Sequence, residues 1–428
     1  MTSDPQSSLF WSEDDLRGEF LRVARQCGEC RRCENLCPPF RALSGGPGGL
    51  GALSGRERMA EEFLRASDLC FQCGRCAVVC PYAQEVDPRR AVDFPRLLLR
   101  ERIVRGRVRG APHGRGLIFN PDLAGSIGSL AAPFSNWIGR SSIARRLLQR
   151  TTGLDHRAPM PSFRRTTFDR WIRKKERRLR KMARSGRGKV ALFHSCSVNY
   201  FRPEVGRSAV SLLARHGIEV VSPDQRCCGR ARLEGGQLHE AVESAKENLR
   251  LLRRYADDGF AIVSPQPECA RMIRSEYPWL APGEDAARVS AATWELCDYL
   301  LAMHRGGKLD LASASRQGSV LYHVSCHARP SGSDPAGLQL LRMVRGLKVT
   351  PLEGCCGMGR TWGFVAGRFS DALETARPLL RAIDDLGPER IVSDCLAAGM
   401  LISARSGKRV HHPIEMLCEA HGHPPGID

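Results

Sequence analysis

Two groups of cysteines with identical spacing lie near the start of the sequence. Both follow C-x2-C-x2-C-x3-C-P, and their members are Cys27, Cys30, Cys33 and Cys37, then Cys70, Cys73, Cys76 and Cys80. Two-residue gaps let one loop present three thiolates to a [4Fe-4S] cubane, while the fourth cysteine reaches the neighbouring cluster. The spacing therefore predicts two adjacent clusters that suit one-electron transfer. One is held by Cys27, Cys30, Cys33 and Cys80, and the other by Cys37, Cys70, Cys73 and Cys76.

Structural zinc is the main alternative for these cysteines, because C-x2-C pairs also occur in zinc sites. A zinc ion needs only four ligands, however, and has no use for a doubled run with Pro38 and Pro81 after each fourth cysteine. The pattern favours iron–sulfur clusters over zinc. Clusters with a purely structural role remain a second alternative.

A further cysteine pattern occurs twice in the second half of the chain. Each copy has a single cysteine, an adjacent pair before glycine, and a later cysteine: Cys196, Cys227, Cys228 and Cys269, then Cys326, Cys355, Cys356 and Cys395. The offsets between copies are 130, 128 and 126 residues, which indicates duplication. Adjacent cysteines can bridge different irons of an open cluster. The pattern predicts a cluster or a reactive dithiol in at least one copy, with buried structural thiols as the alternative.

The elements around these cysteines read as βα units. From Lys189 onward, short apolar runs alternate with amphipathic helices, which is typical of a parallel sheet. The expected strands are 190–193, 219–222 and 260–264 in the first copy, and 320–323, 349–352 and 391–393 in the second. Each cysteine position follows a strand, so the four thiols of a copy should meet where ligands bind in such sheets.

The length of 428 residues predicts several domains, and 42% hydrophobic with 26% charged residues indicates a globular protein. We expect an α+β multidomain chain in which an α-helical dicluster ferredoxin domain precedes two duplicated α/β Cys-Cys-Gly domains. The predicted boundaries are a ferredoxin-like domain over 1–95, a basic connector over 96–188, and Cys-Cys-Gly repeats over 189–315 and 316–428. Periodicity in the connector occurs only in short pieces, so no third core is expected there.

The connector carries the positive charge of the chain. Between Arg96 and Val190 there are 25 Lys and Arg against five Asp and Glu, whereas the whole chain has a net charge of +19. The run at 170–181 is expected to be a solvated helix face. Basic charge alone gives only nonspecific affinity for nucleic acid, and no base-reading module is recognisable, so a nucleic-acid partner is not expected.

An amphipathic segment lies within the connector. Its apolar side chains recur at helical spacing and basic residues follow them: Leu123, Ile127, Leu130, Phe134 and Trp137, then Arg140, Arg145, Arg146 and Arg150. This pattern predicts either attachment to an anionic membrane surface or packing against the protein. Gly125, Gly128 and Pro133 should interrupt a continuous helix.

The cellular setting follows from what the sequence contains and lacks. No run approaches the 18 apolar residues of a membrane span, and the first residues show no basic and apolar leader. We therefore expect a cytoplasmic protein, with peripheral attachment to the inner face of the cell membrane as an extension. In that reducing compartment clustered cysteines bind metals rather than form disulfides. No Gly-x-Gly-x-x-Gly turn is present, so flavin or nicotinamide on this chain is not expected.

Several stretches resemble known families. SPQPECARMIRSEYP (264–278), YHVSCH (322–327), CCGMGRTWGF (355–364), SDCLAAG (393–399) and HHPIEML (411–417) are similar to the cysteine-rich domains of the heterodisulfide reductase B subunit. The chain as a whole resembles the family of the C subunit of anaerobic glycerol-3-phosphate dehydrogenase. LCFQCGRCAVVCPYA and VDFPRLLLR resemble a branch associated with rubrerythrin-like proteins. The resemblance implies noncubane clusters in the Cys-Cys-Gly domains and electron transfer from a partner dehydrogenase toward quinone.

The sequence departs from the family motif at one position in each repeat. The fullest motif has a C-x2-C pair after the later strand, but Gln266 precedes Cys269 by three residues and Ala398 follows Cys395 by three. Each repeat thus has four thiolates where the motif has five. This departure argues against five-thiolate noncubane clusters.

No residue is predicted to be catalytic. His323 and His327 flank Cys326 and could donate protons or ligate, but a packing or hydrogen-bonding role is favoured. Cys297 and Cys418 have no counterpart in the other repeat, and we expect them to be ordinary core cysteines.

Three functions fit these observations. The favoured one is an iron–sulfur subunit that relays electrons from a flavoprotein dehydrogenase or rubrerythrin-like protein toward quinone or another acceptor. The second is a heterodisulfide reductase-like subunit that reduces a disulfide itself. The third is an iron–sulfur sensor or scaffold whose basic connector binds nucleic acid.

Overall fold

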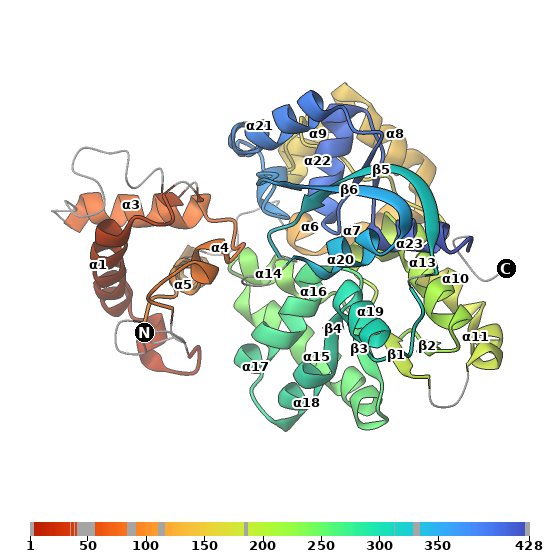
Figure 1. Cartoon of the computed structure of the whole chain (residues 1–428). Helices are drawn as coiled ribbons and strands as arrows, with labels where there is room; N and C mark the ends of the chain where they lie inside the picture. Colours follow the sequence, from red (N-terminus) through yellow and green to blue (C-terminus); the bar gives the residue numbers. More distant parts are fainter. Residues whose placement is uncertain are drawn as a thin grey trace. The chain divides into compact units, whose positions relative to one another are not determined.

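The computed structural model describes residues 4–34, 36–37, 39–40, 56–83, 91–109, 116–183, 187–311, 313–327 and 334–423. The chain divides into two compact units (Figure 1). The smaller unit comprises residues 1–113 and 232–239, and the larger comprises residues 114–231 and 240–428.

The described part of the smaller unit is helical. Its elements are η1 (Ser8–Trp11), α1 (Glu13–Cys30), α3 (Arg56–Leu69), α4 (Arg75–Val78) and α5 (Phe94–Arg109). The Ser12 hydroxyl accepts a hydrogen bond from the Asp15 amide and begins α1 as an N-cap. The rings of Phe20 and Phe63 stack with centroids 4.1 Å apart and join α1 to α3 in a core of their own.

The larger unit contains two four-stranded sheets with the same strand order. The first is β2-β1-β3-β4 and the second is β6-β5-β7-β8, and every neighbouring pair is parallel. The strands are β1 (Lys189–Leu192), β2 (Glu219–Val221), β3 (Ala261–Ser264), β4 (Thr293–Glu295), β5 (Ser315–Val324), β6 (Arg345–Glu353), β7 (Arg390–Val392) and β8 (Val410–His411). The predicted fold class, a helical dicluster region followed by two α/β repeats, is confirmed.

Helices connect the strands in each repeat. The first repeat holds α12 (Cys196–Tyr200), α13 (Pro203–Arg215), α14 (Arg230–Glu234), α15 (Leu238–Asp257), α16 (Pro267–Arg271), the π-helical turn η3 (Met272–Glu276), α17 (Tyr277–Leu280), α18 (Glu284–Ala292) and α19 (Leu296–Arg305). The second holds α20 (Ala336–Arg342), η4 (Trp362–Phe364), α21 (Phe369–Leu386), α22 (Leu396–Ser406) and α23 (Pro413–Ala420).

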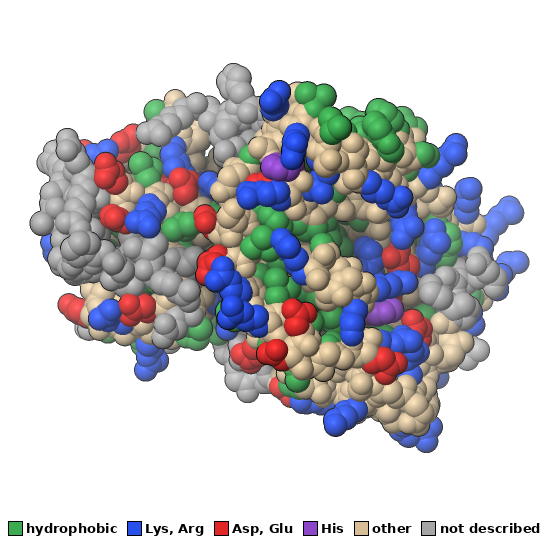
Figure 2. Space-filling view, turned by 90° about the horizontal axis from the view of Figure 1, so that it is seen from above, with side chains coloured by type: hydrophobic (Ala, Val, Ile, Leu, Met, Phe, Trp, Pro, Cys, Tyr) green, Lys and Arg blue, Asp and Glu red, His purple; other side chains and the backbone are tan. Residues whose placement is uncertain are grey.

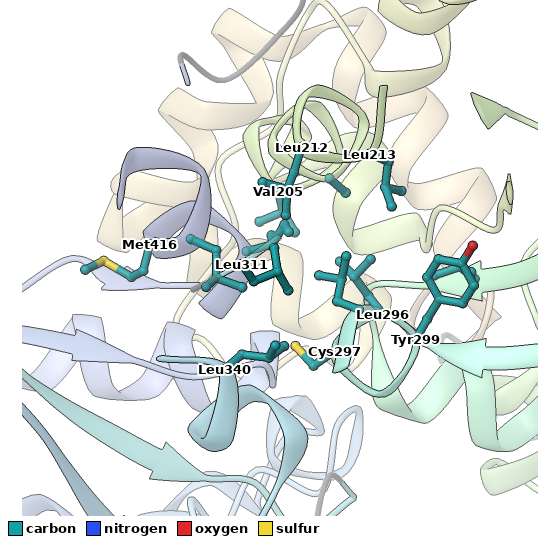
Figure 3. Close-up of a cluster of buried hydrophobic side chains, with 14 of the residues drawn as sticks. Val205, Leu212, Leu213, Leu296, Cys297, Tyr299, Leu311, Leu340 and Met416 are labelled. Carbon is teal, nitrogen blue, oxygen red and sulfur yellow. The ribbon is translucent and has the colours of Figure 1, made fainter. Parts of the chain in front are cut away.

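The two repeats share one hydrophobic core. Helix α13 of the first repeat packs against α23 of the second, and α20 of the second packs against α19 of the first. Figure 3 shows Leu212, Leu296, Leu340 and Met416 from these four helices in one cluster. Cys297 lies in this core, as expected, and is 1% exposed. Each repeat therefore depends on the other for part of its core, although Leu321, Leu379 and Ile391 belong to a further cluster within the second repeat.

The segment predicted as a connector is largely helical. It forms α6 (Gly116–Phe119), α7 (Pro121–Leu130), α8 (Ala132–Arg140), α9 (Ser142–Thr152), α10 (Phe168–Arg173) and α11 (Glu176–Met182). Phe168, Trp171 and Leu179 are buried in the shared core. This part of the connector is thus folded onto the repeats, because its few apolar side chains cover the first sheet region despite the many charges between them.

Helix α7 ends before Ala131 and α8 begins with Pro133 in its first turn, as the proline predicted, whereas Gly125 and Gly128 lie within α7 and do not interrupt it. A Cβ atom at Gly125 would overlap the Tyr200 ring, and one at Gly128 would overlap the Phe163 ring. The glycine face of α7 therefore packs against the protein, and its larger apolar side chains face outward. No helix in the described ranges is long and apolar enough to cross a membrane.

Candidate iron–sulfur centres

Local backbone geometry positions the eight cysteines of the smaller unit. Helix α1 ends at Cys30, and Arg31 then adopts a left-handed conformation with φ of 55° that turns the chain toward Cys33. In the second group, Gln72 and Gly74 have φ of 53° and 73° and form the turn before α4. Both motifs thus fold as tight turns at a helix boundary, as their two-residue gaps require.

The structure brings together Cys27, Cys30, Cys33 and Cys80. Burial raises the pKa of the Cys27 thiol to about 12, and the neighbouring Cys80, Cys33 and Cys30 contribute in the same direction. Burial, Cys80 and Cys30 likewise raise the pKa of Cys33 to about 11. The fourth cysteine of the second motif therefore lies with three cysteines of the first.

The other four cysteines form a second group. Burial raises the pKa of Cys37 well above its usual value, with further contributions from Cys70 and Cys73. The pKa of Cys76 is raised in the same way by burial and then by Cys37, Cys70 and Cys73. The Cys33 Sγ lies 3.9 Å from the Cys76 carbonyl oxygen, so the two groups are adjacent. The exchange pattern predicts the same two sets of four, and which thiols bind each cluster stays a prediction.

These thiols fit iron–sulfur clusters in their chemistry. Among the described residues, no group of three or more His, Cys, Asp or Glu side chains is placed to hold a single metal ion. Burial, and then repulsion between neighbouring thiolates, raises the pKa values of these cysteines. A cationic iron–sulfur core would offset that repulsion and stabilise all four as thiolates.

Hydrogen-bond donors of Gln72 lie beside the second group of cysteines. Both the backbone amide and the side-chain amide of Gln72 lie 3.4 Å from Cys70 Sγ. The Gln72 side chain also donates to the Pro95 carbonyl at 3.0 Å, which fixes its orientation. Hydrogen bonds to cluster sulfurs tune reduction potential. Sequence reasoning missed Gln72, although its place between Cys70 and Cys73 was a signal.

The first Cys-Cys-Gly repeat gathers its four cysteines at the carboxyl ends of its strands. Cys196 begins α12 after β1, Cys227 and Cys228 follow β2, and Cys269 lies on α16 after β3. The thiols form one hydrogen-bonded series in that order, from Cys196 through the adjacent pair to Cys269. The hydrogen bond with Cys227 and burial raise the pKa of Cys196 well above its usual value.

Three polar side chains fix the backbone of the adjacent pair. The Cys227 amide donates to the Asp122 carboxylate at 2.6 Å, the Asn248 side chain donates to the Cys227 carbonyl at 3.2 Å, and the Tyr277 hydroxyl donates to the Cys228 carbonyl at 3.1 Å. Gly229 follows with φ of 83°, a left-handed conformation that favours glycine. Sequence reasoning missed Asp122, Asn248 and Tyr277, and nothing in their local sequence marks them.

The second repeat places its cysteines in the corresponding positions. Cys326 follows β5, Cys355 and Cys356 follow β6, and Cys395 precedes α22 after β7. Burial and then Cys355 raise the pKa of Cys356 to about 12. Burial, Glu268, Cys356 and Cys326 raise the pKa of Cys395, so these thiols are near neighbours.

One carboxyl group links the two repeats. Glu268 precedes Cys269 of the first repeat, and its Oε1 accepts a hydrogen bond from Cys395 Sγ of the second repeat at 3.4 Å. Burial raises the pKa of Glu268 to about 7. The two sets of cysteines therefore approach each other through this side chain, which sequence reasoning did not single out.

Gln266 and Ala398 occupy the positions at which the fullest family motif has a further cysteine. Gln266 is buried, and its side chain donates to the Asp394 carbonyl at 3.2 Å. Ala398 is completely buried in the second repeat. Both residues have structural contacts there, and each repeat offers four thiols.

The two histidines beside Cys326 differ in their surroundings. His323 is buried, with Nδ1 at 3.0 Å from the Ser393 hydroxyl and Nε2 at 3.2 Å from the Gly354 carbonyl. Burial lowers its pKa to about 4, so it is neutral near pH 7. His327 accepts a hydrogen bond at Nε2 from the Arg360 guanidinium. His323 thus has the hydrogen-bonding role that the sequence analysis favoured.

Comparison with known families matches both halves of this architecture. Residues 23–87 match the 4Fe-4S dicluster domain, and residues 190–274 and 320–400 match the cysteine-rich domain that carries the Cys-Cys-Gly motif. The eight cysteines within the first match imply two [4Fe-4S] clusters in the smaller unit.

Curated relatives cover long parts of the chain. The C subunit of anaerobic glycerol-3-phosphate dehydrogenase from Escherichia coli is 28% identical over 71% of this chain and 76% of its own length. Lactate utilization protein A of Geobacillus thermodenitrificans is 33% identical over 54% of this chain and 95% of its own length. The Bacillus subtilis protein of the same name is 31% identical over 54% of this chain and 98% of its own length.

One solved structure, a hypothetical protein from Helicobacter pylori, covers 81% of this chain and 76% of its own at 9% identity. Its TM-score is 0.38, and no argument rests on it.

Proposed function

Because this chain belongs to the family of iron–sulfur proteins that join a 4Fe-4S dicluster domain to two cysteine-rich domains, we propose that it is an electron-transfer subunit of an oxidoreductase complex. It accepts electrons from a partner, a flavoprotein dehydrogenase or a rubrerythrin-like protein, and passes them toward quinone or another acceptor. One relative is by name a dehydrogenase subunit, which supports a partner of that class.

The observation that carries this proposal is the pairing of eight cysteines into two adjacent groups. Each [4Fe-4S] cluster supplies reversible one-electron chemistry when bound. The chain buries Cys70 and Cys76, half-buries the other six thiols, and places the donors of Gln72 beside Cys70 Sγ. The contact between Cys33 and the Cys76 carbonyl keeps the groups close enough for electrons to pass between them.

The direct test combines metal analysis with a partner assay. Protein purified without oxygen should contain at least eight irons with matching labile sulfide, because two [4Fe-4S] clusters need that number. Electron paramagnetic resonance of the reduced protein should show interacting clusters. Quinone reduction should require the partner dehydrogenase. Zinc in place of iron, or no labile sulfide, would contradict the proposal.

A further cluster in the first Cys-Cys-Gly repeat belongs to the same proposal. The series of four hydrogen-bonded thiols from Cys196 to Cys269 supports it, because these thiols are close enough to serve one small cluster. The unchanged protein should then contain more than eight irons per chain. If Cys228→Ser loses only this additional iron, the cluster lies in the first Cys-Cys-Gly repeat.

The same series of thiols favours a second candidate function, the direct reduction of a disulfide in the manner of a heterodisulfide reductase. Two neighbouring thiolates can reduce a substrate disulfide by forming a disulfide of their own. Turnover of a disulfide by the isolated, reduced protein would favour this candidate over the electron-transfer subunit.

We also propose that helices α7, α8 and α9 rest on a membrane surface. Seven large side chains on these helices are exposed, and we call them the apolar face: Leu123, Ile127, Leu130, Phe134, Trp137, Ile143 and Leu147. Figure 2 shows hydrophobic side chains gathered at its upper edge, beside Lys and Arg side chains. Arg140, Arg146 and Arg150 are exposed on the same helices, and this charge suits anionic lipid headgroups.

Replacing Phe134 and Trp137 together by Asp should weaken binding to vesicles that contain phosphatidylglycerol by tenfold or more. Each ring gives about 1.5–3 kcal/mol when it leaves water, and the carboxylates repel the anionic surface. Co-sedimentation with vesicles measures this change. Leu386→Asp is the matched control, because Leu386 is 54% exposed and belongs to α21 rather than to α7, α8 or α9. Equal binding of both variants would contradict a membrane role for α8.

A further inference from the structure

A cavity of about 440 Å³ lies between the two repeats of the larger unit. The first repeat lines it with residues of α16, η3 and the start of α19, and the second lines it with His327, α20 and Asp394. Its walls include the residues that follow β4, β5 and β7. Carboxyl ends of parallel strands and the junctions between domains are where small ligands usually bind.

Three polar side chains of this cavity each have a buried atom without a hydrogen-bond partner: Glu295 Oε1, His327 Nδ1 and Asp394 Oδ1. Glu295 is 8% exposed and Asp394 is 2% exposed. A buried polar atom left without a partner costs about 1–3 kcal/mol. Three such atoms on one cavity point to a ligand that completes their hydrogen bonds.

The partners of the remaining atoms hold these side chains in place. Glu295 Oε2 accepts from the amides of Cys297 and Asp298 at 2.7 and 3.1 Å, as the N-cap of α19. Asp394 Oδ2 accepts from the Tyr322 hydroxyl at 3.2 Å. Each carboxyl group therefore has one oxygen engaged by the protein and one buried oxygen without a hydrogen-bond partner, on a residue that lines the cavity.

The cavity also offers donors. Arg360 can only donate, so the His327 Nε2 that it contacts is the unprotonated nitrogen. The proton of neutral His327 is then on Nδ1, the atom that has no partner. Arg271 and Arg274 line the same cavity, and the side chain of Arg274 is exposed at its edge. These three residues provide N–H groups suited to a carboxylate.

The lining of the cavity combines acidic and basic side chains. Burial, and then Asp298 and Asp394, raise the pKa of Glu295 well above its usual value. Burial also raises the pKa of Asp298. Arg271 and Arg274 contribute basic groups to the same lining.

We propose that this cavity binds a small hydroxycarboxylic acid, whose carboxylate meets Arg274, Arg271 and His327 Nδ1 while its hydroxyl meets the free oxygens of Glu295 and Asp394. The carboxylate needs donors, and the hydroxyl can both donate and accept. One ligand of this class satisfies all three unpartnered atoms. This binding site is separate from the proposed clusters. Neither the two [4Fe-4S] clusters nor a cluster in a Cys-Cys-Gly repeat depends on it.

Malate and succinate are the matched probes, because they differ by one hydroxyl group. Isothermal titration of the full-length, oxygen-free protein should show malate binding at least tenfold tighter than succinate, and 1,4-butanediol, which lacks a carboxylate, should not bind. A site that hydrogen-bonds a hydroxyl discriminates strongly against the analogue without it. Equal affinities for malate and succinate, or no binding of malate at millimolar concentration, would overturn the proposal.

Arg274→Gln tests the carboxylate arm. This exposed side chain can change without disturbing the core, and the loss of its charge-assisted hydrogen bond should weaken malate binding by about tenfold or more. Arg250→Gln, an exposed arginine on α15 away from the cavity, is the control and should bind malate as the unchanged protein does. Unchanged affinity in Arg274→Gln would count against the site. Iron content should be the same in all three proteins, which separates this result from the cluster proposal.

Discussion

Cys80→Ser is expected to remove the cluster that Cys27, Cys30 and Cys33 hold, although Cys80 belongs to the other motif in the sequence. The reason is its position in the first group of four, where it raises the pKa of both Cys27 and Cys33. The variant should lose about four irons per chain, because a [4Fe-4S] cluster needs its fourth thiolate. Iron analysis and integrated electron paramagnetic resonance measure the loss.

Double variants decide whether the motifs exchange their fourth cysteine. Two substitutions in one ligand set should be no worse than one, whereas two substitutions in different sets should remove both clusters. We therefore expect Cys80→Ser with Cys30→Ser to lose about four irons, and Cys80→Ser with Cys73→Ser to lose about eight. The reverse order would mean that each motif holds its own cluster.

Leu340→Ala should destabilise both repeats, although Leu340 lies on α20 of the second. Leu340 is fully buried in the shared core, and truncation of such a leucine costs about 3 kcal/mol. Helix α20 packs against α19 of the first repeat. Hydrogen exchange of the slowest amides in β1 and β3 should therefore accelerate roughly 100-fold in this variant. The slowest amides of the second sheet should accelerate to the same extent.

Leu386→Ala is the control for this change. Leu386 is 54% exposed at the end of α21, and its truncation should alter stability by no more than about 0.5 kcal/mol. If Leu340→Ala accelerated exchange only in β5 to β8, the two repeats would be independent folding units and the shared core would contribute little.

The cysteine groups could be predicted from sequence because their geometry is local. Two-residue gaps fix three thiols on one turn, and the exchange of the fourth follows from the motif itself. The positions of the Cys-Cys-Gly thiols could be predicted equally well, because each thiol follows a strand whose carboxyl end must lie at one edge of a parallel sheet.

Groups that act over long sequence separations could not be predicted. Asp122 contacts the Cys227 amide across 105 residues, and Glu268 contacts Cys395 across 127. A single carboxylate has no periodicity or spacing that identifies its partner. The strands β4 and β8 were missed because three and two residues are too few for a recognisable pattern.

The connector shows why a mixed charge pattern misleads. Phe168 and Trp171 are separated by charged residues, yet both are buried in the shared core. The amphipathic segment was recognised, but its orientation depended on the rings of Tyr200 and Phe163, which lie against the glycine face of α7. Only the tertiary structure decides that the large side chains are the exposed ones.

The reciprocal packing of α13 on α23 and of α20 on α19 has a bearing on how the chain arose. A protein with one repeat would leave half of this interior open to water and could be stable only as a pair of identical subunits. Gene fusion of such a pair would free the two halves to diverge. Glu268 and Asp394 differ in this way although they occupy matching positions, because Glu268 directly precedes Cys269 and Asp394 directly precedes Cys395. The longer Glu268 side chain reaches Cys395 in the other half, whereas Asp394 accepts from Tyr322 within its own.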